Sequence, residues 1–338
     1  MIKLFNGDAL DVMDKLIEKG IKVDAIITDP PYGTTACSWD SVIPFDEMWK
    51  RLNIIMKSNG TIALFGSEPF SSALRMSNIE MFKYDWIWEK SQGANFALVK
   101  HQPYKVHEII SVFYNDLSKT TYSTKAFKEL RRYFKDLLNY IGLPKSKIVN
   151  DVGGRADHCF RSDSSQWCIP SEETYNILIN KYNIDKYKGF KTYSELNLIY
   201  EDELKSFKKT YNYITTDGKK YISGKGHSGE TTGNFKKTQT INNGKRFPRS
   251  IQKFAQNKTI SFHPTQKPVE LMEYLIRTYT NEGELVLDFT MGSGTTLVAC
   301  KQLNRNGIGI ELNEDYFKIA QQRVDEAVEG SSLNKDVE

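Results

Sequence analysis

The sequence has few cysteines and no recognisable metal-ligand pattern. Its four cysteines, Cys37, Cys159, Cys168 and Cys300, include no Cys-x-x-Cys pair, and its five histidines show no ligand spacing beside them. A chain of 338 residues can bury a large core without a disulfide or a metal staple. We therefore expect a reduced, cytoplasmic protein with no structural metal.

The sequence also lacks a long apolar run. No stretch approaches the ~20 apolar residues that a membrane-spanning helix needs. Charged residues interrupt the first eight positions too early for a signal peptide. The expectation is a soluble chain with no membrane partner.

The small net charge of +4 hides an uneven distribution. Residues 116–260 contain 27 Lys/Arg and 15 Asp/Glu, whereas the rest of the chain contains 19 and 27. A solvated, flexible basic loop would also give an excess of positive charge. The position of this basic stretch between two candidate catalytic segments instead favours binding to a polyanion. The candidate DNA contacts in the most basic part, residues 217–259, are Lys219, Lys220, Lys245, Arg246 and Arg249.

Short β-rich runs alternate with helical stretches in both flanks. The runs are residues 2–5, 23–28, 61–65, 85–88, 109–114, 285–287 and 307–310. This alternation predicts an α/β fold with a mixed, mostly parallel seven-stranded sheet and helices on both faces. Ligands in such folds bind beyond the carboxyl ends of the strands. Five polar or glycine positions directly follow predicted strands: Asp8, Asp29, Gly66, Asp288 and Glu311.

The middle of the chain, residues 116–259, is predicted to be an insert of helices and loops. Its helical spacing falls at residues 123–138, 145–151 and 171–182. Three short helices with a Gly-bearing turn are typical of a helix-turn-helix-like module, here over residues 120–185, and also of many unrelated helical inserts. Residues 215–259 are rich in Gly, Lys, Asn and Thr, and are expected to be mobile without a ligand.

The tetrapeptide Asp29-Pro30-Pro31-Tyr32 has the groups needed to hold a planar exocyclic amine. The Asp29 carboxylate and the Pro30 carbonyl can accept the two amine hydrogens and stabilise the positive charge that grows during attack. The two prolines fix φ, and the Tyr32 ring offers a face on which a base can stack. A Pro-Pro pair alone is more often a rigid surface turn, but the apolar run before it favours a site.

Residues 288–295, with the sequence Asp-Phe-Thr-Met-Gly-Ser-Gly-Thr, form a Gly-rich strand-to-helix turn suited to an adenosyl cofactor. The third glycine of the dinucleotide fingerprint is absent and no Gly-Lys-Ser/Thr follows, so an NAD site and a P-loop lose support. Glu311 ends the next predicted strand, where a carboxylate can bind the ribose hydroxyls. A helix N-terminal acid is the alternative role for Glu311.

These two segments together resemble the amino-group DNA methyltransferases of the β class, in which the catalytic motif precedes the cofactor loop. The resemblance covers residues 1–115 and 260–330, and it implies a permuted, Rossmann-like catalytic domain with S-adenosylmethionine as cofactor. It assigns the catalytic role to Asp29, Pro30, Pro31 and Tyr32. It assigns the cofactor to Asp8, Asp29, His263, Thr265, Lys267, Pro268, Asp288, Phe289, Gly292, Ser293, Gly294, Thr295 and Glu311.

The resemblance also implies a substrate and partners. Asp at the first catalytic position is more typical of N6-adenine than of N4-cytosine enzymes, so we expect methyl transfer to a flipped adenine in double-stranded DNA, with the insert recognising the target. The base pocket is expected near Gly66, Trp88, Glu89, Lys90, His107 and Glu108. Trp88 is equally typical of a core residue, and a lone histidine such as His107 is ordinarily structural.

Several alternatives to this function stay open. Cytosine N4 and an RNA base have the same kind of amine, and an inactive DNA-binding regulator is a more distant alternative. A homodimer and a cognate restriction endonuclease are the protein partners that the resemblance suggests, in a bacterial or phage setting. Amine methylation needs no thiol nucleophile, so Cys37 is interpreted as incidental.

Overall fold

The computed structural model describes residues 1–34, 40–93, 95–115, 127–154, 156–207, 209–223, 228–229, 233–234, 240–256 and 266–331. The chain divides into two compact units. Unit 1 comprises Met1–Tyr114 and Thr210–Glu338, and unit 2 comprises Asn115–Lys209. Unit 2 is therefore inserted into the chain of unit 1. Within the described residues, no helix is both long and apolar enough to cross a membrane.

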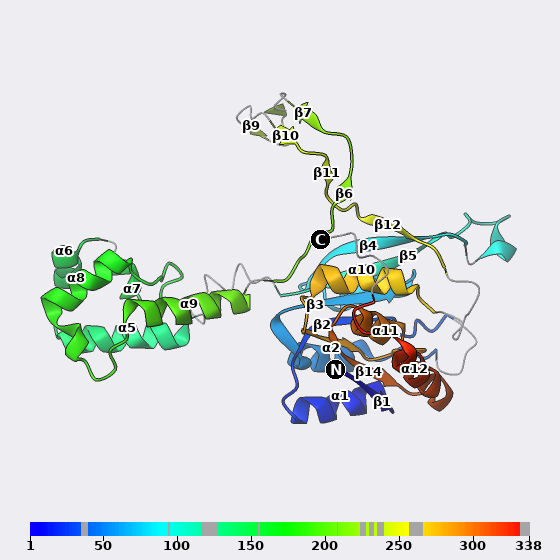
Figure 1. The fold of residues 1–338 in the computed structure, drawn as a ribbon, viewed down its shortest axis with the longest axis horizontal. Coiled ribbons are helices and arrows are strands. Elements are labelled where there is room, and N and C mark those ends of the chain that lie inside the picture. The colour runs from blue at the N-terminus through cyan, green and yellow to red at the C-terminus, as the bar shows by residue number, and fades with distance from the viewer. Residues whose placement is uncertain are drawn as a thin grey trace. The chain divides into compact units, whose positions relative to one another are not determined.

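An eight-stranded sheet forms the centre of unit 1 (Figure 1). The strands are, in their order across the sheet, β1 (Ile2–Asn6), β14 (Asn306–Glu311), β13 (Leu285–Asp288), β2 (Val23–Thr28), β3 (Met56–Gly66), β5 (His107–Phe113), β4 (Phe82–Lys90) and β12 (Ile251–Phe254). Every neighbouring pair is parallel except the two that involve β5. The predicted mixed, mostly parallel α/β sheet is confirmed. It has eight strands rather than seven because β12 adds to the edge of β4.

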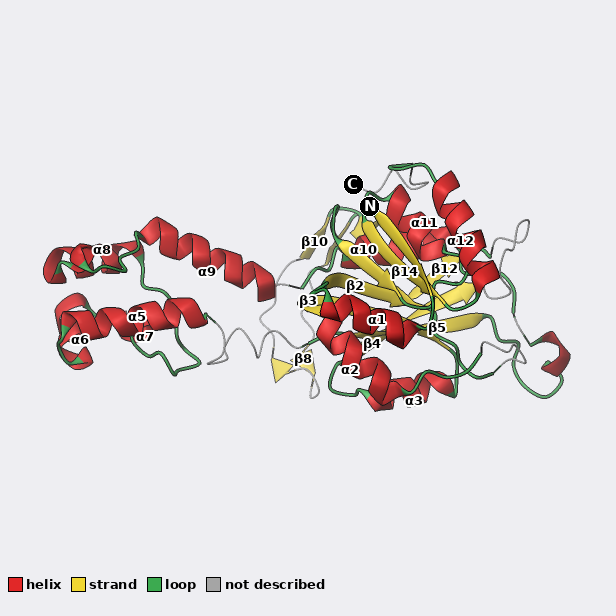
Figure 2. Cartoon of the chain, turned by 90° about the horizontal axis from the view of Figure 1, so that it is seen from below, coloured by secondary structure: helices red, strands yellow, loops and turns green. Residues whose placement is uncertain are grey.

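Helices cover both faces of this sheet, as Figure 2 shows. One face packs against α1 (Ala9–Glu18), α2 (Phe45–Ile55) and α3 (Phe70–Ser77), and the other against α10 (Val269–Tyr279), α11 (Thr295–Gln302) and α12 (Glu314–Glu326). The side chains of β2 alternate between the two layers: Ala25 and Ile27 face α10 and α11, whereas Ile26 faces α1 and α2. All three are fully buried, which explains why this strand reads as a continuous apolar run.

Three strand-to-helix turns of unit 1 are fixed by local backbone chemistry. Asp8 caps α1, where its Oδ1 accepts hydrogen bonds from two backbone N–H groups at 2.8 and 3.2 Å. Asn313 caps α12 in the same way, at 2.9 and 3.0 Å. α11 begins after Gly294, whose φ of +77° favours glycine. These turns follow β1, β14 and β13, so all three lie at the carboxyl edge of the sheet.

Unit 1 also contains a two-stranded ribbon, which lies between Thr210 and β12 in the sequence. Its antiparallel pairs are β6 (Thr216–Asp217) with β11 (Lys245–Arg246), β7 (Tyr221–Ser223) with β10 (Thr240–Asn242), and β8 (Ser228–Gly229) with β9 (Gly233–Asn234). The sequence pattern of this stretch predicts no strand. β12 also lies inside the predicted insert, residues 116–259, although it pairs with β4 of the main sheet.

Unit 2 is built from helices around its own core. They are α5 (Lys128–Ile141), α6 (Lys145–Val152), α7 (Ala156–Cys159), α8 (Glu172–Tyr182), the short η2 (Ile184–Lys186) and α9 (Tyr193–Phe207). Phe134 and Tyr175 are fully buried in this core. The predicted helices at 123–138, 145–151 and 171–182 correspond to α5, α6 and α8, with residues 123–126 outside the described part. The helix-turn-helix-like character of residues 120–185 stays a prediction.

Candidate active site

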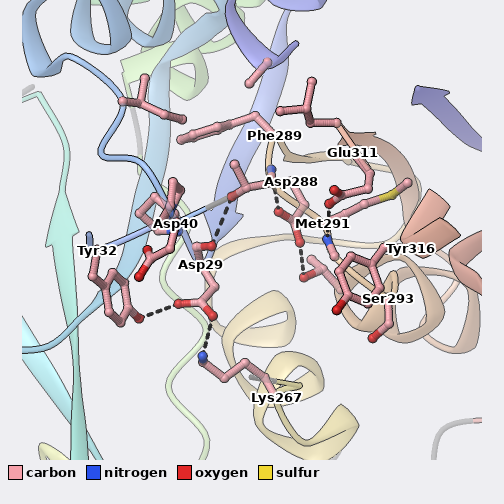
Figure 3. Close-up of a pocket in the computed structure, with 18 of the residues that line it drawn as sticks. Asp29, Tyr32, Asp40, Lys267, Asp288, Phe289, Met291, Ser293, Glu311 and Tyr316 are labelled. Atoms are coloured by element: carbon pink, nitrogen blue, oxygen red, sulfur yellow. Dashed lines mark hydrogen bonds and ion pairs between the residues drawn. The ribbon is translucent and has the colours of Figure 1, made fainter. Parts of the chain in front are cut away.

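A cavity of about 570 Å³ opens at the carboxyl edge of the sheet in unit 1 (Figure 3). Of the five positions predicted at this edge, Asp8, Asp29, Asp288 and Glu311 line the cavity. Gly66 does not line it. The strand ends of β1, β2, β13 and β14 therefore bring together residues that are far apart in the sequence.

Most of the predicted site residues lie on the wall of this cavity. The lining includes Asp8, Asp29, Pro30, Pro31, Tyr32, Lys267, Asp288, Phe289, Gly292, Ser293, Thr295 and Glu311. Pro268 and Gly294 are described but do not line it, and His263 and Thr265 fall outside the described residues. Trp88, Lys90 and Glu108 of the expected base pocket also line the cavity, whereas Glu89 and His107 do not.

Asp29 is held by two groups at the centre of the cavity (Figure 3). The Tyr32 hydroxyl donates to one carboxylate oxygen, and the Lys267 ammonium contacts the other. Lys267 Nζ also lies 3.3 Å from Oε2 of Glu108, and Lys90 Nζ lies 2.7 Å from Oε1 of Glu108. Two carboxylates and two ammonium groups thus form one buried network whose formal charges cancel.

The pKa values of this network reflect burial opposed by charge pairing. Burial raises the pKa of Asp29, and Lys267 opposes this rise. Burial would also raise the pKa of Glu108, but Lys267 and Lys90 together hold it below its usual range. The two carboxylates outweigh burial at Lys267 and raise the pKa of its ammonium. Burial and the Asp29 charge raise the pKa of Tyr32, so its hydroxyl remains a donor.

Threonine hydroxyls connect the Gly-rich turn to the end of β2. Asp288 accepts hydrogen bonds from the hydroxyls of Thr28 at 2.6 Å and Thr296 at 2.5 Å, and from the backbone N–H of Thr290 at 3.2 Å. Burial raises the pKa of Asp288 to about 6. The Thr290 hydroxyl donates to the backbone carbonyl of Asp29 at 3.1 Å. Asp288 therefore acts as the anchor that joins the ends of β2 and β13.

The Gly-rich turn itself is fixed by Glu311 and by close packing. The carboxylate of Glu311 accepts backbone N–H groups from Gly292 at 2.9 Å and Asn313 at 2.8 Å. Burial raises the pKa of Glu311. A Cβ on Gly294 would lie 2.9 Å from Cβ of Ala320, so this position needs glycine for space as well as for its φ.

Some residues that support the cavity wall were not predicted from the sequence. Arg323 of α12 donates to the carbonyl of Ser293 at 2.5 Å, and to the hydroxyls of Ser293 at 2.9 Å and Thr295 at 3.1 Å. Burial lowers the pKa of Arg323 to about 10. Nothing in the sequence around Arg323 marks this role. By contrast, Thr28 directly precedes the tetrapeptide at positions 29–32, and Thr296 directly follows residues 288–295. Both could have been predicted from their adjacency to these motifs.

Asp40 holds the two residues that follow the tetrapeptide at positions 29–32. Its two carboxylate oxygens accept the backbone N–H groups of Gly33 at 2.8 Å and Thr34 at 2.9 Å. Residues 40–44 line the cavity on this side. Asp40 thus joins Gly33 and Thr34 to the part of the cavity wall formed by residues 40–44. Cys37 falls outside the described residues.

The five predicted DNA contacts lie on the ribbon or next to it. Lys219, Lys220, Lys245 and Arg249 are exposed, and Arg246 is half-buried. The Arg246 guanidinium lies 5.1 Å from the ring centre of Tyr221 and donates to Oδ1 of Asn242 at 2.5 Å. Lys245 pairs with Asp217 at 2.8 Å. Arg246 therefore stabilises the ribbon, whereas the exposed residues are accessible to a polyanion.

Comparison with known proteins gives a family match over most of the chain. The DNA methylase family model N6_N4_Mtase matches residues 23–322. Type II methyltransferase M.HpaI of Haemophilus parainfluenzae is 44% identical over 87 residues, covering 25% of this chain and 28% of that protein. Type II methyltransferase M1.MboII of Moraxella bovis is 35% identical over 157 residues, covering 39% of this chain and 54% of that protein. The alignments thus span only about a quarter to a half of these two relatives.

Solved structures of similar proteins cover nearly the whole chain at low identity. The complex of M1.HpyAVI with SAM has a TM-score of 0.49 and 20% identity, covering 96% of this chain and 100% of that chain. The cytosine-N4-specific PvuII DNA methyltransferase has a TM-score of 0.47 and 12% identity, covering 95% and 86%.

Proposed function

Because the chain belongs to the N6/N4 DNA methylase family, we propose that it transfers a methyl group from S-adenosylmethionine to the N6 amine of an adenine in DNA. The observation that carries the proposal is the position of Asp29 in the cavity. Its carboxylate accepts a hydrogen bond from the Tyr32 hydroxyl, and its backbone carbonyl accepts one from Thr290 of the Gly-rich turn. An amine acceptor, a stacking surface and a candidate cofactor loop thus meet in one cavity.

The residues present fit the proposed cofactor. Asp8 and Glu311 offer carboxylates for an amino group and for ribose hydroxyls, and Phe289 and Met291 offer apolar surface for an adenine ring. S-adenosylmethionine, when bound, supplies an electrophilic methyl group on a sulfonium. The cavity of about 570 Å³ falls within the range typical of small-molecule sites.

Asp29 and Pro30 prepare the amine for attack. The lone pair of an adenine amine is delocalised into the ring, so the nitrogen is a poor nucleophile until its hydrogens are held. The carboxylate of Asp29 and the carbonyl of Pro30 accept those two hydrogens and stabilise the developing positive charge. Each carboxylate oxygen has two acceptor sites, so Asp29 can hold the amine while Tyr32 and Lys267 remain in contact.

Lys267 keeps Asp29 in the form that accepts hydrogens. Burial favours the protonated carboxyl, and the adjacent ammonium favours the carboxylate. Transfer then needs no covalent enzyme intermediate, and the protein contributes positioning and electrostatics. The choice of adenine rests on the Asp at position 29, since the family includes both N6 and N4 enzymes.

Product analysis tests this proposal. The protein is incubated with labelled S-adenosylmethionine and unmethylated genomic DNA, followed by nucleoside mass spectrometry and mapping of the modified positions. N6-methyladenine at one recurring motif is the expected result. N4-methylcytosine would overturn the choice of base, and label in RNA alone would overturn DNA as the substrate.

The Asp29→Ala variant tests the assigned catalytic role. We expect transfer to be abolished while cofactor binding, measured by calorimetry, stays within a few fold of wild type. Asp14→Ala is the matched control, because Asp14 is a half-exposed carboxylate in a surface ion pair with Arg51. Retained transfer in Asp29→Ala would refute the role of this carboxylate.

A further inference from the structure

The loop between β4 and β5, residues 91–106, presents large apolar side chains to solvent. Figure 1 shows it as the cyan segment that projects beyond these two strands. All residues from 96 to 104 are exposed, including the short η1 (Phe96–Leu98). The side chain of Phe96 is 78% exposed and that of Leu98 is 49% exposed. Apolar groups gathered at one exposed tip indicate a contact surface.

The base of this loop is held by specific contacts. The side-chain oxygen of Asn95 accepts the backbone N–H of Lys105 at 2.7 Å, and the Tyr104 hydroxyl donates to the carbonyl of Gly93 at 3.3 Å. The Lys105 ammonium also contacts the hydroxyl of Ser67, which directly follows β3. The exposed tip is therefore presented on a structured base.

Both ends of the loop start at the wall of the cavity. Lys90 is the last residue of β4 and Glu108 is the second residue of β5, and both line the cavity that contains Asp29. The loop therefore leaves the sheet next to the place where a flipped base is proposed to bind.

The charge of the loop favours a polyanionic partner. Residues 91–106 contain Lys100, His101 and Lys105 and no Asp or Glu. Phosphate groups along a duplex complement such a surface, and an exposed apolar side chain on a loop that also carries basic residues matches the pattern of a wedge accompanied by backbone contacts.

We propose that this loop enters the DNA duplex when the target base leaves it, with the Phe96 ring filling the vacated space. The inference rests on the proposed function, because only a base that must leave a duplex creates such a gap. An aromatic ring stacks on the neighbouring bases and offsets part of the cost of unstacking them. Lys100, which is exposed, then contacts a flanking phosphate.

The test compares two duplexes that contain the mapped methylation site. In one the target base is paired, and in the other it faces an abasic position. The proteins are wild type, Phe96→Ala, Phe96→Trp and the control Met76→Ala, whose exposed side chain (70%) lies in the last turn of α3. Single-turnover methylation is measured on the duplexes with adenine at the target. Flipping is followed by fluorescence on a separate pair of duplexes with 2-aminopurine at the target, which has no N6 amine to methylate.

For Phe96→Ala we expect a rate on the paired duplex about tenfold or more below wild type, in line with the loss of one base–aromatic stack. On the abasic duplex the rate should return close to wild type, because no base pair has to be broken for the target base to leave. Phe96→Trp should retain activity on both duplexes, and Met76→Ala should match wild type.

Three results would overturn the inference while the proposed function stands. One is a Phe96→Ala rate equal to wild type on the paired duplex. Another is an equal loss on both duplexes, which would indicate a general binding or folding role. The third is a shift of Phe96→Ala to a smaller species in sedimentation, which would assign the loop to contact with a second copy of the chain. If wild type methylates no DNA, the proposed function itself fails.

Discussion

Replacing Lys267 by methionine removes the ammonium that contacts both Asp29 and Glu108 in the cavity. Methionine keeps much of the apolar stem, so the main change is the lost charge. Glu108 retains Lys90 at 2.7 Å, whereas Asp29 keeps only the neutral hydroxyl of Tyr32 among these partners. The effect should therefore appear mainly at Asp29.

The size of the effect follows from the charge that is lost. Two opposite unit charges about 4 Å apart interact by about 4 kcal/mol at an effective dielectric constant of about 20. This interaction favours ionised Asp29, so its loss should raise the pKa of Asp29 in Lys267→Met. A buried carboxyl without its counter-charge is protonated rather than left charged.

The sign of the pH dependence follows from the form that acts. Only ionised Asp29 accepts the amine hydrogens, so activity falls as the pH drops through the pKa of Asp29. Burial already raises this pKa in the wild type, and the substitution raises it further. The acid limb of kcat/KM should thus move to higher pH in Lys267→Met, and raising the pH should restore much of the activity.

The assay is the pH profile of methylation, measured together with cofactor affinity and thermal unfolding. Lys267→Arg retains the charge and should leave the acid limb near its wild-type position. Lys57→Met is the control, because Lys57 pairs with Asp24 at 2.6 Å at the start of β3, away from the cavity. If the acid limb of Lys267→Met superimposes on wild type while only cofactor affinity falls, Lys267 serves the cofactor and the reasoning about Asp29 is refuted.

Three further substitutions test the supports of the site. Thr296→Val removes a hydrogen-bond donor from the carboxylate of Asp288. Because the pKa of Asp288 is raised to about 6, the protonated form favours the folded state at low pH. The free energy of unfolding in urea should therefore fall by about 1–3 kcal/mol above pH 6 and by less below it. A loss independent of pH would contradict this. Gly294→Ala should lower the free energy of unfolding by about 1–3 kcal/mol more than Gly283→Ala does. Both glycines have a similar positive φ, but only at Gly294 would a Cβ be crowded, by Ala320. Equal losses of stability would exclude crowding as the cause. Replacing three exposed basic residues on or next to the ribbon by glutamine should reduce the slope of log K for DNA binding against log[salt] by up to about 3. The control replaces three exposed lysines of α1 and α2 or next to them. An unchanged slope would count against the ribbon as a DNA contact. The ribbon positions are Lys219, Lys220 and Arg249, and the control positions are Lys15, Lys19 and Lys50.

The sequence by itself determined the α/β class and the two motifs of the candidate site. Strands such as β2 are buried on both faces, so their apolar runs are visible locally. Asp29 and Asp288 directly follow such runs, and the carboxyl ends of parallel strands meet at one edge. These signals come from neighbouring residues, which is why no tertiary information was needed to predict them.

Only the tertiary structure decided how distant residues meet. Lys267 reaches Asp29 across 238 positions of the chain, and Glu108 joins them from β5. The sequence motif assigned Lys267 to the cofactor site. A motif carries no information about contacts between distant segments, so the pairing of Lys267 with Asp29 could not be predicted from it. β12 also could not be predicted from the sequence. It has only four residues with little burial, so its local strand signal is weak. Its pairing with β4 depends on a sheet edge that exists only in the folded protein. Electrostatic pairing and edge strands are properties of the assembled fold, and therefore of the structure alone.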